Sequence, residues 1–498
     1  MKKIFILMFA AGMMALTGCD LDVNDNPNVP SSESITPSLL FPAVENAIAD
    51  VVGDQMFNYG GFFAQYFEQA PTANQYNDLA ELNIDEGSDL FNRCYSILYA
   101  GALTDINDIM SKTDNPSDLY ACTVLRAQAF QLVVDNLSDA PYTEALQGSA
   151  NAMPIWDDGQ TVYEGVLKEL DDAEAALAGD PMTMTDPMCG QDLDKWIQYA
   201  NTLRMRMYLR LIDGGVNTSA YTSKLQALLN AGNFITSDVK WDVYSNASGQ
   251  YNPWYGAFYR LGTYNHCAAY PIVSYMNLTG DPRRAYAMNK SVKNGEYEGQ
   301  IPGSKTLTGD WLGISSSYNN DYVSLINYSG FAAAPIYLFS LAERYFLESE
   351  AQLRFNNNAS KAKEAYENAL YTDIVNKTGD ASAANEFIGS SRVSWDNASN
   401  KLNLIYMQKW VALFMVDHME AWSEVRRTDV PALSSLSAAD VFSSPTSYTA
   451  GEMINPGVNH IVAQGLAKRV PYPSTARTLN KNTPEAKLLS DRVFWDAK

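Results

Sequence analysis

Residues 195–212 read KWIQYANTLRMRMYLRLI, and this stretch decides the fold. Five of its apolar residues return every three or four positions and therefore share one stripe along an α-helix: Trp196, Ala200, Leu203, Met207 and Leu211. Arg204 and Arg206 fall on other faces of the same helix. The stretch predicts a long helix that packs its apolar stripe against other helices.

Helical patterns continue on both sides of this stretch, as far as about Leu229. Apolar residues recur at helical spacing in 119–132 and again in 163–177, and Pro, Gly, Asn or Asp marks the breaks. The pattern predicts helix following helix, joined by short links.

A second helical block opens near Leu338, where residues 338–351 and then 362–369 predict a helical hairpin that sets small Ala beside large Tyr. Such pairs are typical of tetratricopeptide-type packing, because the small residue admits its neighbour's ring; no regular period of about 34 residues accompanies them. Residues 404–425 predict one further helix, apolar almost all round from Trp410 to Val416 and therefore buried. The sequence predicts an all-α fold of tetratricopeptide-like helical pairs.

Periodicity fades over about residues 236–334, where Gly, Pro, Asn and aromatic residues take over. This predicts a long irregular aromatic-rich insertion, and loops of that length are usually functional when ordered. Aromatic faces suit sugar rings or peptide side chains; packing of each ring against the helices is the competing interpretation. We predict ligand-binding residues here and in the loop after the aromatic helix 57–67; they are Asn74, Tyr76, Asp78, Trp254, Tyr255, Trp311 and Tyr322.

The N-terminus carries a predicted lipoprotein signal. Two lysines precede an apolar run shorter than the about 20 residues of a membrane span, and Leu16-Thr17-Gly18-Cys19 matches a bacterial lipobox. Cys19 would carry several acyl chains, palmitate among them, and anchor the protein firmly; an ordinary secretory signal is the alternative. Residues 1–18 are the predicted signal peptide, 19–37 an extended lipidated tether and 38–498 the helical domain.

The charge balance argues against nucleic-acid binding. The chain has 35 Lys and Arg against 57 Asp and Glu, a formal charge of −22, and removal of the signal peptide takes away two more lysines. Binding to phosphates or to an anionic lipid surface needs clustered basic residues. We interpret the acidity as solubilising an exposed protein.

No metal, cofactor or catalytic motif is visible in the sequence. The four cysteines besides Cys19 lack metal-ligand spacing and are predicted to be disulfides or buried free thiols: Cys94, Cys122, Cys189 and Cys267. The three histidines, His266, His418 and His460, are isolated from one another. Alternating Asp and Asn in the tether lack the glycine and distal glutamate of a calcium loop.

Several segments together resemble the SusD-like family, within its second subfamily. The matching segments are 139–145 (DAPYTEA), 195–206, 252–255 (NPWY), 281–283 (DPR), 408–410 (QKW), 420–428 (EAWSEVRRT), 469–473 (RVPYP) and 495–496 (WD). They follow the family's order and span almost the whole mature chain.

The resemblance implies four tetratricopeptide-like helical pairs in a lipid-anchored, outward-facing outer-membrane protein of Bacteroidetes. It implies that the protein is not an enzyme but captures glycans, peptides or other nutrients for a SusC-like TonB-dependent transporter. The family motifs themselves imply structural roles: core packing for Trp196, Trp410 and Trp422, and ion pairs between Glu424 and Arg426 or Arg427. Two other functions stay open, a surface glycan-degrading enzyme with a carboxylate pair across a cleft and a scaffold without a small ligand.

Overall fold

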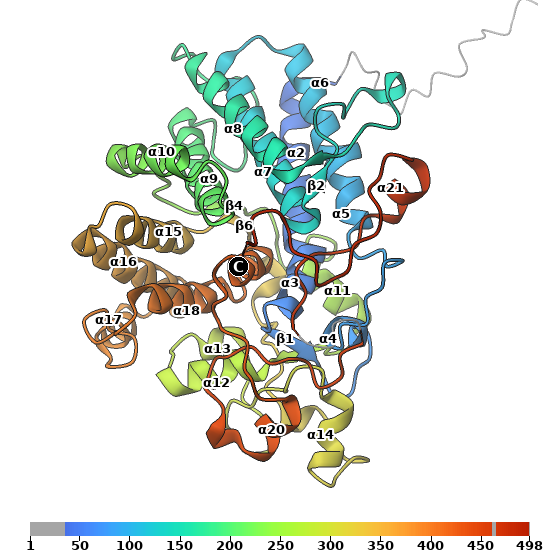
Figure 1. Cartoon of the computed structure of the whole chain (residues 1–498), viewed down its shortest axis with the longest axis vertical. Coiled ribbons are helices and arrows are strands. Elements are labelled where there is room, and N and C mark those ends of the chain that lie inside the picture. Colours follow the sequence, from blue (N-terminus) through green and yellow to red (C-terminus); the bar gives the residue numbers. More distant parts are fainter. Residues whose placement is uncertain (1–34, 461–464, 498) are drawn as a thin grey trace, which may run out of the picture.

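The computed structural model describes residues 35–460 and 465–497 (Figure 1). The predicted signal peptide, the lipidation site Cys19 and the tether up to residue 34 lie outside these described residues. None of the helices within the described ranges combines the length and the apolar character that a bilayer crossing requires.

Consecutive helices pack in pairs that follow one another around the molecule (Figure 1). The pairs are α7 (Pro116–Leu137) with α8 (Gly159–Ala175), α9 (Leu193–Asp213) with α10 (Thr218–Ala231), α15 (Leu341–Arg354) with α16 (Ala359–Thr378), and α18 (Lys401–Leu413) with α19 (His418–Thr428). The predicted all-α fold of tetratricopeptide-like pairs is confirmed. The tryptophans Trp196, Trp410 and Trp422 are buried in the core as expected.

Helix α9 is buried on nearly every face, which its apolar stripe alone did not indicate. Its arginines are accommodated by carboxylates on neighbouring helices. The guanidinium of Arg206 binds Glu343 of α15 at 2.7 Å, and Arg210 binds Glu420 of α19 at 2.6 Å. A buried charge is tolerable only when it is paired and hydrogen-bonded, so these contacts fix α9 against α15 and α19.

A second buried cluster surrounds Arg427 near the end of α19. Its guanidinium lies 2.6 Å from both Glu350 and Glu424 and 2.5 Å from Asp213. Of the two arginines predicted to pair with Glu424, it is Arg427 that does so; Arg426 instead donates to backbone carbonyls, among them that of Asp135 at 2.7 Å.

The single helix predicted over 404–425 is wrong in one respect, because the chain breaks into α18 and α19. Met415 adopts a left-handed backbone with φ 63°, and the Asp417 side chain accepts a hydrogen bond from the Glu420 backbone N–H. Asp competes with the helix for backbone donors and therefore caps a new helix here.

The segment 236–334 holds more regular structure than its sequence pattern suggested. Its helices are α11 (Pro253–Leu261), α12 (Tyr270–Thr279), α13 (Arg284–Ala287) and α14 (Lys305–Trp311), and its strands are β4 (Val239–Trp241) and β5 (His266–Ala268). These elements are too short for periodicity to reveal them. Helix α11, for example, is set by local chemistry: the Asn252 side chain accepts from the N–H groups of Trp254 and Tyr255, and Gly262 ends the helix with φ 61°.

Two short sheets join this segment to the helical body. Strand β1 (Phe67–Gln69) pairs antiparallel with β5, and Gln69 lies opposite His266. Strand β4 pairs with β6 (Ile336–Phe339). The long N-terminal helical run consists of α2 (Pro37–Val51), the π-helical turn η2 (Val52–Met56) and α3 (Phe57–Phe63). The β1–β5 sheet places His266 next to this run.

Glycines let this run approach α19 closely. A side chain at Gly60 would meet the backbone of His418 at 2.8 Å, and one at Gly61 would meet the His418 ring at the same distance. The four cysteines of the described chain, which the sequence left open as thiols or disulfides, are free and buried.

Candidate functional site

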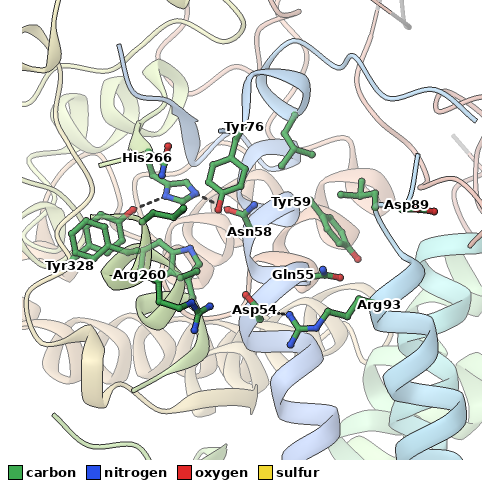
Figure 2. Close-up of a pocket in the computed structure, with 17 residues that line it drawn as sticks. Asp54, Gln55, Asn58, Tyr59, Tyr76, Asp89, Arg93, Arg260, His266 and Tyr328 are labelled. Carbon is green, nitrogen blue, oxygen red and sulfur yellow. Dashed lines mark hydrogen bonds and ion pairs between the residues drawn. The ribbon is translucent and has the colours of Figure 1, made fainter. Parts of the chain in front are cut away.

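A cavity of about 390 Å³ opens where η2 and α3 face α11 (Figure 2). Helix α5 (Asn92–Ser96) and the start of α4 (Asn77–Ala80) close its other sides. We call it the His266 pocket; its lining includes Asp54, Gln55, Asn58, Tyr59, Tyr76, Leu79, Asp89, Leu90, Arg93, Trp254, Ala257, Phe258, Arg260, Leu261, Asn265, His266 and Tyr328. The π-helical geometry of η2 is typical of functional positions in helices.

His266 is held by two hydrogen bonds that use both ring nitrogens (Figure 2). Burial lowers the pKa of His266 to about 3, so the imidazole is neutral at physiological pH. Its Nε2–H donates to Asn58 Oδ1 at 2.7 Å, and its Nδ1 accepts from the Tyr328 hydroxyl at 2.6 Å. The ring is a fixed, uncharged part of the wall and has no free nitrogen for proton transfer.

Aromatic rings stack around this histidine. Tyr76 lies on the His266 ring with centroids 4.9 Å apart and an interplanar angle of 29°. Behind it, Tyr328 is sandwiched between Trp254 at 4.8 Å and Phe258 at 3.8 Å. Tyr76 and Phe258 remain half-buried, whereas Trp254 is only 4% exposed. The accessible aromatic surface of the pocket therefore belongs to Tyr76 and Phe258.

Charged groups at the pocket balance one another. Arg93 pairs with Asp54 and, at 3.1 Å, with Asp50 of the adjoining helix α2. The lining also contains Asp89 and the exposed Arg260, so that it holds two acidic and two basic side chains in all. Arg260 makes no ion pair with any described residue. A lining with no excess charge suits an uncharged polar ligand better than an ion.

A family model described as "Starch-binding associating with outer membrane" matches residues 27–446. The chain belongs to the SusD-like family. No curated protein sequence matches it.

Solved SusD-like structures share the whole fold. A chitin-binding SusD homologue from Flavobacterium johnsoniae is 21% identical with a TM-score of 0.71, covering 92% of this chain and 98% of that one. A SusD homologue from Bacteroides fragilis is 19% identical with a TM-score of 0.71 and covers 93% and 100%. One from Bacteroides uniformis is 20% identical with a TM-score of 0.66 and covers 92% and 99%.

Two of the ligand-binding residues predicted from the sequence, Tyr76 and Trp254, line the His266 pocket of this SusD-like chain. Trp254 is packed between Phe67, at 5.7 Å and nearly parallel, and Tyr328. The Trp254 ring is buried, because the short helix α11 turns it inward, and it therefore offers little exposed face for stacking. Tyr255, the next residue, lies against Tyr251 and Tyr259 and does not line the pocket.

The other predicted residues lie apart from the His266 pocket. Asn74 accepts a hydrogen bond from the Lys305 ammonium, and exposed Asp78 accepts one from Asn83 at 2.9 Å. Trp311 packs on Phe442 at 5.0 Å, and Tyr322 lines a separate cavity. The structure thus brings only Tyr76 and Trp254 together in one pocket, places Tyr322 in another, and leaves the other four predicted residues outside both linings.

Asn58, Arg93, His266 and Tyr328 were not predicted as site residues. Asn58 could have been recognised from the sequence, because it is the one amide side chain in the aromatic run 57–63. His266 and His418 seemed isolated in sequence, yet both contact the ring of Phe67, at 4.7 and 4.8 Å. Within the described ranges no three His, Cys, Asp or Glu side chains gather as a metal site.

Proposed function

We propose that this protein captures glycan chains at the cell surface in the His266 pocket and passes them to a SusC-like TonB-dependent transporter. The observation that carries the proposal is the half-buried ring of Tyr76, which lines the His266 pocket and stacks on a fixed neutral imidazole. A rigid aromatic face with polar groups around it matches a sugar, whose ring has an apolar face and hydroxyls at its edge.

The polar groups of the pocket suit hydroxyls. Gln55 and Arg260 supply donors, Asp89 supplies an acceptor, and all three line the cavity. The description of the family as starch-binding and the chitin-binding relative both support a carbohydrate over a peptide.

The cellular setting follows from the N-terminal motif and the family. Lipidation at Cys19 would hold the protein on the outer membrane, facing outward, as the predicted lipobox implies. The family's association with the outer membrane supports that location, and transporter partnership would give the captured glycan a route inward.

Titration calorimetry with starch-derived and chitin-derived oligosaccharides tests the binding step. Tyr76→Ala should weaken binding, whereas Tyr371→Ala, which removes an exposed tyrosine on α16, serves as the matched control. If the wild type binds neither glycan family, or if both variants bind equally well, the proposed role of the His266 pocket is wrong.

A mild-detergent pull-down of the lipid-anchored protein tests the partnership. Co-purification of a large TonB-dependent barrel in near-equal amount would support delivery to a transporter. Absence of such a barrel after cross-linking would leave a surface binder that works alone.

A further inference from the structure

A second cavity of about 270 Å³ lies beyond the β1–β5 sheet, and it shares no lining residue with the His266 pocket. Its walls come from the loop 291–301, from α14 with the 3₁₀ turn η5 (Asn320–Tyr322), and from α20 (Ala438–Ser443). In Figure 1, α14 and α20 lie together at the lower end of the molecule. We call this cavity the Tyr322 pocket.

The floor of the Tyr322 pocket is rigid. The Gln300 side chain is 1% exposed; its Oε1 accepts from the Tyr318 hydroxyl, and its Nε2 donates to Ser304 and Thr308 at 2.8 Å each. Gly299 lies so close to the backbone of Tyr270 that a Cβ would meet it at 2.4 Å. The floor is therefore preorganised and does not collapse into the cavity.

Aromatic and apolar side chains form the walls. Tyr318 and Tyr322 contact each other with centroids 5.5 Å apart, and Phe442 faces them from α20, backed by Trp311. Tyr322 is half-buried, and Leu312 is 44% exposed at the opening. Accessible aromatic and apolar surface thus surrounds a small hollow, the arrangement expected of a ligand pocket.

Polar side chains at the rim of the Tyr322 pocket keep hydrogen-bonding capacity for a ligand. The Lys293 ammonium lies 5.0 Å from the centre of the Tyr322 ring and makes no ion pair or hydrogen bond with any described residue. Asn294 donates to Glu298 at 2.6 Å, so the carboxylate keeps lone pairs for another donor. One cation and one carboxylate at the rim favour a ligand rich in hydroxyls over a charged one.

We propose that the Tyr322 pocket is a second carbohydrate site, which takes one sugar unit of a glycan. This inference rests on the proposed function, because it assigns the same ligand class to a separate cavity. The two sites are linked by the chain: His266 lines one and Tyr270 the other, and four residues span at most roughly 14 Å between their Cα atoms. A polymer that reaches both sites gains avidity that a short oligosaccharide lacks.

Calorimetry with a short and a long oligosaccharide tests the second site, using whichever of the starch-derived and chitin-derived series binds the wild type. The short ligand should give two sites per protein. Tyr322→Ala should remove one of them and keep the other, and it should weaken binding of the long ligand by about tenfold or more. Lys293→Gln, at the exposed rim, should weaken the same site by a smaller factor.

Matched variants separate the possible failures. Tyr76→Ala should weaken the site that Tyr322→Ala keeps by about fivefold to tenfold, while Tyr371→Ala should leave both sites unchanged. Thermal unfolding checks that each variant is folded. One site per protein that is insensitive to both Tyr322→Ala and Lys293→Gln overturns the second site and leaves the proposed function intact. Failure of the wild type to bind any member of either series overturns both.

Discussion

The buried arginines of the helical scaffold and two cations at the pocket rims differ in how their charge is paired. Around Arg210 and Arg427, the scaffold buries guanidinium groups among carboxylates, and both side chains are fully buried. In the segment 236–334, Arg260 and Lys293 stand at pocket rims without ion pairs to described residues, and stacked aromatic rings supply much of the packing. Most of the recognisable sequence motifs therefore belong to the scaffold, whereas only Trp254, from the motif at 252–255, contributes a motif side chain to the two pockets.

The largest expected effect comes from removing the centre of the buried ion cluster. Burial raises the pKa of Glu424, but Arg427 and Lys409 outweigh it and hold that pKa well below its usual range. Arg427→Met would leave Glu424, Glu350 and Asp213 without that partner and should lower the free energy of unfolding by about 3–5 kcal/mol at pH 7. Urea denaturation followed by circular dichroism measures the loss.

The pH dependence of this variant has a defined sign. In the wild type, a carboxyl group whose pKa is depressed by folding stabilises the protein at any pH above its pKa in the unfolded state. This stabilisation is lost as the pH falls through the pKa of the group in the folded state. In Arg427→Met the buried carboxyls can relieve their repulsion by protonation, so the deficit should shrink below pH 5. Arg392→Met, at an exposed position, is the control, and an equal loss there would contradict the assignment.

One buried carboxyl group in the scaffold, that of Glu45, lacks a basic partner, and its replacement should stabilise the protein. Glu45 of α2 is fully buried beside Asp186, and it forms no ion pair with a basic side chain of the described residues. Burial, together with the nearby Asp186, raises the pKa of Glu45 to about 10. Glu45→Gln keeps the shape and removes the titration, so it should add about 1–3 kcal/mol at pH 7.

The sign again follows from linkage. A raised folded pKa means that the stability contribution of Glu45 is complete below pH 4.5 and is lost as pH rises towards about 10. The gain from Glu45→Gln should therefore vanish near pH 4 and grow from pH 5 to 9 in thermal unfolding. A variant that is less stable than the wild type at pH 8 would show that the acid proton itself is needed.

On the ligand side, Tyr76→Ala should change binding more than folding. Loss of one stacking face is worth about 1 kcal/mol, so glycan affinity should fall about fivefold to tenfold. Because Tyr76 is half-buried, its removal should disturb unfolding much less than Arg427→Met. The same experiment with Trp254→Ala would be hard to interpret, since removing that buried ring should cost about 3–5 kcal/mol of stability.

The smallest effect is expected at an exposed ion pair. Lys224 lies 3.2 Å from Asp171, and both side chains are nearly half exposed. Solvent screening leaves such a pair worth less than about 1 kcal/mol, so Lys224→Met should shift the urea midpoint only slightly. If Lys224→Met lowered the free energy of unfolding as much as Arg427→Met does, burial would not explain why the two ion pairs differ in strength.

Sequence patterns predicted the scaffold well because long helices repeat their apolar contacts many times. The stripe through Trp196 and Leu211 and the packing of small and large residues near Tyr366 needed only periodicity to be recognised. Where a local interaction overrides periodicity, as Asp417 does by capping α19, the prediction of a single helix failed. Short helices such as α11 depend on one capping residue and escape any averaged pattern.

The sequence by itself determined the helical fold, the acidic character and the membership of the SusD-like family, because these depend on repeated or contiguous features. Only the tertiary structure decided the pockets. Asn58 and His266 are 208 positions apart, and the β1–β5 pairing brings them to 2.7 Å. It also decided that Trp254 packs inward while Tyr76 stays accessible, since burial depends on which elements meet and not on residue type.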